Sequence, residues 1–94
     1  SISGETTAGG VRRIAGALQR HQPTLIIIEL GANDGLRGLP LITMKKNLAN
    51  IITQSHESGA DVLLVGMKLP PNYGVAYTKK FRHVYAELAK RYDI

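Results

Sequence analysis

The chain has 94 residues, of which 44% are hydrophobic and 20% charged, a composition typical of a single globular domain at most. It has no cysteine, which excludes disulfides and a cysteine nucleophile, and it has no apolar run near the ~20 residues that span a bilayer, so no stable membrane insertion is expected. The net charge is +5, but the basic residues lie along expected helices without aromatic residues placed for base stacking, which favours solvent-exposed helix faces over a nucleic-acid partner.

The first expected element is an amphipathic helix over residues 7–21. Val11, Ile14 and Leu18 repeat at helical spacing. Residues 24–30 then predict a strand, because consecutive Leu and Ile residues without alternation are typical of a central parallel strand that is buried on both faces. Helices are therefore expected on both sides of the sheet.

A second strand and two more helices follow. An apolar stripe predicts a helix over 40–58, and Gly59 stands where a left-handed C-terminal cap is expected. A buried strand is expected over 61–67, followed by a turn at 69–74 and a helix over 75–92 with an aromatic, core-facing stripe. Helices that alternate with strands imply parallel strands joined by right-handed crossovers. The fold class is α/β, and no domain boundary divides residues 1–94.

Two short segments point to chemistry. Gly31-Ala32-Asn33-Asp34-Gly35 follows the first strand and predicts a turn at its carboxyl end, where open α/β sheets bind ligands. In this turn Asn33 would be displayed and Asp34 would anchor its own turn. Ser3-Gly4-Glu5-Thr6-Thr7 is the second segment. Each alone would be an ordinary turn, but their combination favours function.

Gly4 and Asn33 have the properties of oxyanion-hole donors. Ester hydrolysis by a serine enzyme requires a nucleophile, a base and donors aimed at the oxyanion of the tetrahedral intermediate. A glycine lets its backbone N–H approach the reacting carbonyl without a Cβ in the way, and an Asn amide is an uncharged donor.

These segments resemble blocks of the SGNH (GDSL-type) serine hydrolases, in particular the bacterial multifunctional acyl-CoA thioesterase, lysophospholipase and arylesterase branch. The resemblance extends over nearly the whole chain and includes residues 21–23, 29–38 and 69–74. It implies a flavodoxin-like three-layer α/β/α fold, of which this chain is a partial domain, and a small-molecule acyl ester or thioester substrate. It also implies a periplasmic or secreted location, and its Gly and Asn blocks fall on Gly4 and Asn33.

The nucleophile and the base of that family have no counterpart inside the chain. The family's Gly-Asp-Ser-Leu block would lie before Ser1 and its Asp-x-x-His block after Ile94, so we expect the 94 residues alone to be inactive. No histidine has an aspartate three residues before it, and no metal or cofactor site is indicated. No catalytic role is therefore expected for the serines and histidines inside the chain, which are Ser1, Ser3, Ser55, Ser58, His21, His56 and His83.

Two further expectations concern binding. Leu36, Leu69 and Tyr73 lie on the loops after the two strands and could grip an acyl chain, although loop leucines more often pack onto their own domain. The outer edge of the 24–30 strand would be unpaired where the family's first strand lies, so self-association or pairing with missing segments is expected. The alternative to an esterase is a small non-catalytic α/β module for binding or assembly.

Overall fold

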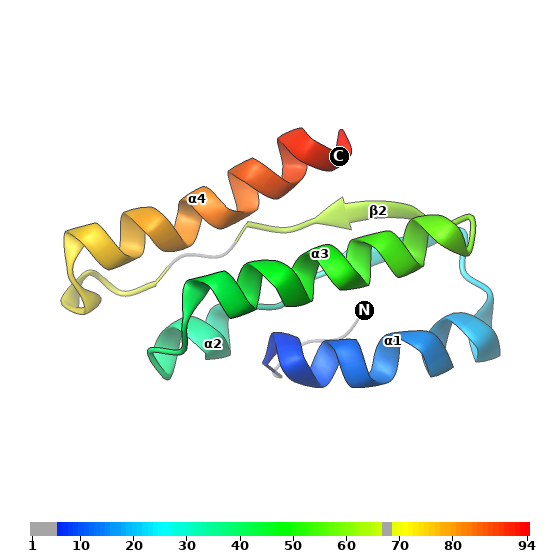
Figure 1. Cartoon of the computed structure of the whole chain (residues 1–94), viewed down its shortest axis with the longest axis horizontal. Coiled ribbons are helices and arrows are strands. Elements are labelled where there is room, and N and C mark those ends of the chain that lie inside the picture. Colours follow the sequence, from blue (N-terminus) through cyan, green and yellow to red (C-terminus); the bar gives the residue numbers. More distant parts are fainter. Residues whose placement is uncertain (1–5, 67–68) are drawn as a thin grey trace.

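The computed structural model describes residues 6–66 and 69–94. The three long helices begin and end within one residue of the expected positions. In Figure 1 the helices and strands lie along the long axis, with α2 and the start of α4 at the same end. The elements in chain order are α1 (Thr7–His21), β1 (Leu25–Ile28), α2 (Ala32–Leu36), α3 (Leu41–Glu57), β2 (Asp61–Leu64), the 3-10 turn η1 (Pro71–Tyr73) and α4 (Val75–Tyr92).

The two strands pair in parallel, as expected, with Leu25 opposite Asp61 and Ile28 opposite Leu64. Both are shorter than the expected ranges 24–30 and 61–67. The chain leaves the ladder after Ile28 and turns toward α2, so the expected range extends two residues, Glu29 and Leu30, beyond the pairing. Met67, the last residue of the second expected range, lies outside the described residues.

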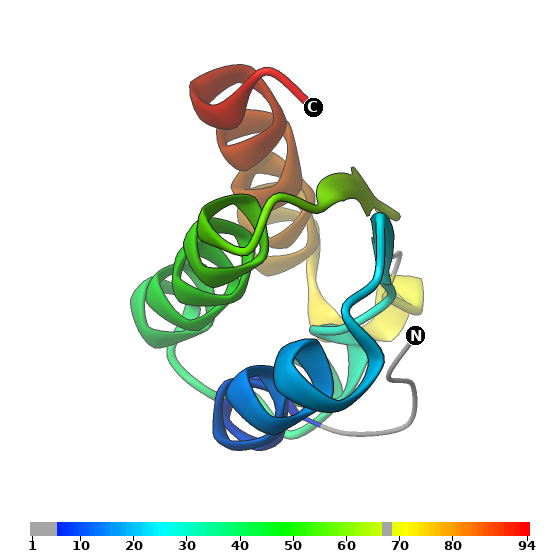
Figure 2. The same cartoon turned by 90° about the vertical axis from the view of Figure 1, so that its right-hand side faces the viewer.

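The helices cover only one face of the sheet. Figure 2 shows α1, α3 and α4 on the same side of the two strands. Ile28 and Val62 face these helices and are buried, whereas Leu25 and Leu63 point the other way and are 52% and 51% exposed. The expectation of helices on both faces is therefore wrong for the described residues. An unbroken apolar run shows that both faces of a strand are apolar, but it does not show which elements of a given chain cover them.

Helix α3 lies at the centre of the core and packs against α1, α4 and β2. It ends at Glu57 and is followed by Gly59, whose φ of +90° is the left-handed conformation that glycine adopts without steric cost. The N–H groups of Gly59 and Ala60 close the helix by donating to carbonyl oxygens of its last turn. The predicted C-terminal cap is thus confirmed. The largest fully buried side chains are Met44, Leu48, Ile51, Ile52, Phe81 and Leu88.

Helix α4 separates its aromatic and basic faces as the sequence predicts. Phe81 and Tyr85 are buried and meet edge to face, with ring centroids 5.4 Å apart. An ion pair between Lys45 and Glu87 joins α4 to α3, and the hydrogen bond from Lys45 lowers the pKa of Glu87. None of the described helices combines the length and the apolar character needed to cross a lipid bilayer. The exposed basic residues of α4 are Lys79, Lys80, Arg82, Lys90 and Arg91.

Candidate active site

Asn33 lies in α2, at the carboxyl end of β1. The segment expected as a turn is a five-residue helix, closed by bonds from Gly35 N–H to the Gly31 carbonyl (3.0 Å) and from Arg37 N–H to the Asn33 carbonyl (3.1 Å). The Asn33 side chain is half-buried and makes no hydrogen bond to any described residue. Its amide is therefore not engaged in holding the described part of the fold together.

The entry into α2 is held by Tyr85. Its hydroxyl donates to the Leu30 carbonyl at 2.6 Å, and burial followed by the charge of Asp34 raises the pKa of Tyr85, which keeps the hydroxyl protonated. Gly31 makes this approach possible. Its φ is +110°, and a Cβ built there would lie 2.1 Å from the Tyr85 oxygen. A glycine is thus required immediately before α2 on both conformational and steric grounds.

Asp34 does not anchor its own turn, contrary to the expectation from the sequence. Its buried carboxylate reaches the start of α1, where Oδ1 accepts from the Thr7 N–H at 2.7 Å and Oδ2 accepts from the Thr7 hydroxyl at 2.6 Å. A carboxylate is favoured at a helix N-terminus, where unpaired N–H groups and the helix dipole attract negative charge. The first turn of α1 has no acidic residue of its own.

Thr7 and Asn47 are the residues that sequence reasoning missed. The Thr7 hydroxyl donates to Asp34 and accepts from Asn47 Nδ2 of α3 at 3.1 Å, so three helices meet at one buried hydroxyl. Thr7 is fully buried. The only available signal was a first helical turn without an acidic residue, and this signal does not say which distant carboxylate supplies the charge.

The loops after the two strands are joined at the same end of the sheet. The Tyr73 hydroxyl donates to the Leu36 carbonyl at 3.1 Å, and the Tyr77 hydroxyl donates to the Leu39 carbonyl at the same distance. Asn33 and the 69–74 loop therefore lie at one end, as expected. Leu36 is 44% exposed, whereas Leu69 packs against the core. Of the three expected acyl-binding residues, the structure brings Leu36 and Tyr73 together and turns Leu69 inward.

Gly4, the second expected oxyanion donor, lies outside the described residues, as do Ser1 and Ser3. The described serines and histidines are far from a catalytic arrangement. The Ser55 and Ser58 hydroxyls donate to carbonyl oxygens at the C-terminal end of α3. His83 is exposed beside Glu87, with 2.8 Å between Nε2 and Oε1. The described residues contain no group of three or more His, Asp and Glu side chains that could hold a metal ion.

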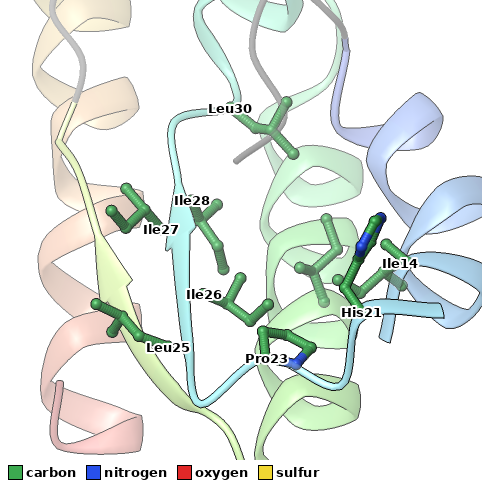
Figure 3. A pocket seen from close by; sticks show the side chains of 10 residues that line it. Ile14, His21, Pro23, Leu25, Ile26, Ile27, Ile28 and Leu30 are labelled. Carbon is green, nitrogen blue, oxygen red and sulfur yellow. The ribbon is translucent and has the colours of Figure 1, made fainter. Parts of the chain in front are cut away.

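An apolar groove runs along the edge of β1 that faces away from β2. Figure 3 shows Ile26 and Leu30 of β1 and its extension pointing toward α1, with Pro23 and His21 at one end of the groove. In the described part of the chain no strand pairs with this edge. Its walls are almost wholly aliphatic and present no converging polar groups, so the groove is suited to packing against another apolar segment and not to ester chemistry.

A family model described as "GDSL-like Lipase/Acylhydrolase family" matches residues 1–94. The chain is 47% identical over 89 residues to "Esterase TesA" of Pseudomonas aeruginosa, covering 95% of this chain and 44% of that protein. It is 44% identical over 94 residues to "Arylesterase" of Vibrio mimicus, covering 100% of this chain and 47% of that protein. The chain thus spans about half the length of the curated relatives it matches.

Solved structures give the same grouping. The psychrotrophic esterase EstA from Pseudoalteromonas sp. is similar with a TM-score of 0.94 and 41% identity, covering 99% of this chain and 51% of that chain. AlinE4, an SGNH-hydrolase family esterase, is similar with a TM-score of 0.91 and 41% identity, covering 98% of this chain and 50% of that chain.

Proposed function

Because the chain belongs to the GDSL-like lipase/acylhydrolase family, we propose that the protein containing it is a serine hydrolase that cleaves esters or thioesters through an acyl-enzyme. The names of the relatives support this chemistry. They include an esterase, an arylesterase and, from Escherichia coli, "Thioesterase 1/protease 1/lysophospholipase L1", which is 39% identical over 94 residues and covers 45% of that protein. The substrate is a small acyl ester or thioester.

Asn33 is the oxyanion donor that this chain supplies, together with the backbone N–H of Gly4. One observation carries the assignment. The Asn33 amide has no hydrogen-bond partner among the described residues, although it lies on a tightly bonded helical turn at the carboxyl end of β1. A donor with no competing partner, carried on a backbone that hydrogen bonds hold in place, suits electrostatic stabilisation of an oxyanion, because that backbone needs no reorganisation during the reaction.

The nucleophilic serine and the Asp/His pair belong to parts of the protein outside residues 1–94. This division is supported by Ser55 and Ser58, whose hydroxyls donate to carbonyl oxygens at the end of α3, and by His83, which is exposed beside Glu87. Donors without a nucleophile stabilise an oxyanion that is never formed. The isolated 94-residue chain should therefore not hydrolyse esters.

The test uses the full-length protein that contains these residues. It should hydrolyse p-nitrophenyl esters, and a serine-directed fluorophosphonate should label one serine outside residues 1–94. Asn33→Ala should lower kcat by about 10²–10³-fold with KM changed little, because an oxyanion donor acts mainly in the transition state. Asn50→Ala is the matched control, since Asn50 is an exposed amide of α3 whose side chain has its one described hydrogen bond with Gln54.

Three results would contradict the proposal. Retention of more than about a third of kcat in Asn33→Ala would remove Asn33 from the oxyanion hole, because loss of a donor should cost far more. Labelling at Ser55 or Ser58 would mean that the active site is built differently. A full-length protein that neither hydrolyses esters nor reacts with fluorophosphonate would support the non-catalytic binding module instead.

A further inference from the structure

The side chain next to the proposed oxyanion donor is a buried carboxylate with both oxygens engaged. Asp34 is 3% exposed and follows Asn33 in α2. Its Oδ1 and Oδ2 are each within 2.7 Å of a donor atom of the same residue, Thr7, which lies 27 positions earlier in the chain. A two-point bond of this kind fixes the direction of a side chain as well as its position.

We infer that Asp34 is a positioning residue for the Asn33 amide, and that it acts by bonding α2 to Thr7 at the start of α1. The inference rests on the proposed function, since it gives Asp34 a role in the same site. Asp34 itself contacts no substrate. Its effect is to hold the adjacent donor where the oxyanion forms.

Thr7 is a fixed anchor for this bond. It is fully buried, it is the first residue of α1, and its hydroxyl also accepts from Asn47 Nδ2 at 3.1 Å. The hydroxyl therefore has one donor and one acceptor partner and cannot rotate away without leaving a buried polar group unpaired. Such an unpaired group is costly in a protein interior, so α1 and α3 together resist movement of α2.

The bond between Asp34 and Thr7 is linked to Asn33 by a short segment that backbone hydrogen bonds hold in place. Asp34 also accepts from the Leu39 N–H through its backbone carbonyl at 2.9 Å, and Arg37 N–H donates to the Asn33 carbonyl. On the other side of Asn33, the chain is held by the bond from Tyr85 to Leu30. Asn33 is thus held from both sides. Among the described residues that follow Asn33 in α2, only Asp34 forms a side-chain hydrogen bond to α1.

The bond between Asp34 and Thr7 also directs the negative charge of Asp34 away from the proposed oxyanion. A carboxylate directed toward an oxyanion would oppose the negative charge that develops there. Both oxygens of Asp34 instead point to the N-terminus of α1, where N–H groups and the helix dipole stabilise negative charge. Asn33 can then act as an uncharged donor beside an acidic residue.

The experiment uses the full-length enzyme and changes Thr7, so that both Asn33 and Asp34 remain. Thr7→Val keeps the N–H and the shape but removes the hydroxyl that Oδ2 needs. We expect kcat to fall by about 10-fold or more with KM within about 2-fold, since small misplacements of catalytic groups cost up to ~10²-fold. Thr7→Ser, which restores the hydroxyl, should recover most of the rate. Ile52→Val, in the buried part of α3 away from this network, is the control for lost stability alone and should leave kcat unchanged.

A double-variant cycle separates positioning from a merely structural role. If Thr7 acts through Asn33, then Thr7→Val should lower kcat by less than about 2-fold once Asn33 has been replaced by Ala, so the two effects should not multiply. Asn47→Ala gives a milder version if Thr7→Val fails to fold, because it removes the bond that fixes the Thr7 hydroxyl but leaves that hydroxyl able to bond Asp34. Its loss of kcat should also vanish in the Asn33→Ala background.

The outcomes distinguish this inference from the function on which it rests. A wild-type enzyme without ester hydrolysis overturns the proposed function and the inference together. An active enzyme in which Thr7→Val and Asn47→Ala leave kcat unchanged, or multiply independently with Asn33→Ala, overturns the inference alone.

Discussion

The Tyr85 hydroxyl, in the middle of α4, donates to the Leu30 carbonyl at 2.6 Å across 55 positions of the chain. This bond joins the last long helix to the segment that leads from β1 to Asn33. Because both atoms are buried, neither can exchange its partner for water. The position of α2 thus depends on a helix that is formed near the end of these residues.

Replacing Tyr85 with Phe should destabilise the 94-residue chain. The substitution keeps the ring that packs against Phe81 but leaves the Leu30 carbonyl buried and without its donor, at a cost of about 1–3 kcal/mol. Urea unfolding monitored by circular dichroism would measure it. Tyr73→Phe, which removes a bond on an exposed loop, is the comparison and should cost less. Equal losses in the two variants would show that burial does not set the value of the Tyr85 bond.

Stability should fall when the pH rises above about 10, the ordinary pKa of tyrosine. Burial, and then the charge of Asp34, raises the pKa of Tyr85 in the folded chain, so the unfolded chain loses the proton first. The contribution is therefore fully present below the unfolded pKa and is lost as the pH rises toward the folded one. Urea midpoints measured from neutral to alkaline pH should show this decline. The decline should be shallower in Tyr85→Phe, and an unchanged slope would contradict the assignment.

Gly31→Ala should be strongly destabilising for two separable reasons. The residue has φ of +110°, which costs an L-residue of order 1–3 kcal/mol, and its new Cβ would meet the Tyr85 oxygen. Combining Gly31→Ala with Tyr85→Phe removes the closest clash, with the Tyr85 oxygen, but keeps the backbone strain. The double variant should thus lose less stability than the sum of the two single variants. Additive losses would show that the clash is relieved by movement elsewhere.

Gly4→Ala in the full-length enzyme should behave differently from Asn33→Ala. The backbone N–H of residue 4 remains, so the loss should come from the added methyl group near the acyl carbonyl and should grow with substrate bulk. The Asn33→Ala loss should be the same for short and long acyl esters, because an amide donor to the oxyanion does not contact the chain. Measuring kcat and KM for both variants on one short and one long ester tests this contrast. Parallel dependence on acyl length in the two variants would contradict it.

The free edge of β1 should promote self-association of the 94-residue chain. Bonds to β2 use the carbonyls of Thr24 and Ile28, so the polar groups of Leu25 and Ile27 face the opposite edge in a parallel ladder. Sedimentation velocity should show association that increases with concentration. Ile27→Pro removes an N–H from the free edge and should reduce association, while Ile26→Pro should instead disrupt pairing with β2 and lower stability. A compact monomer at all concentrations would contradict this role of the edge.

The helices and the parallel strands could be predicted because each rests on a local signal. Apolar spacing defined α1, α3 and α4, and Gly59 marked the end of α3. The ends of the strands could not be predicted, because a strand ends where its pairing ends and Leu30 is as apolar as Ile28. The exposure of Leu25 and Leu63 could not be predicted from the sequence either, since it depends on which elements cover the second face of the sheet.

The candidate site was only half visible in the sequence. Asn33 could be found because it follows a buried strand within a short recognisable segment. The partner of Asp34 could not, because Thr7 and Asp34 are 27 positions apart and nothing in the sequence encodes their distance in space. Asn47 is still harder to find, since a polar residue on a helix more often faces water than a buried hydroxyl.

The central place of α3 has a consequence for the order in which the chain can fold as it leaves the ribosome. Within residues 1–94, α1 comes before α3, but α3 supplies the surface on which α1 packs, so α1 lacks this partner until about residue 57 has emerged. β2 and α4 can then add in turn to an existing core. A pause in translation within α3 should therefore leave a protease-sensitive nascent chain, whereas a pause after it should leave a protected one.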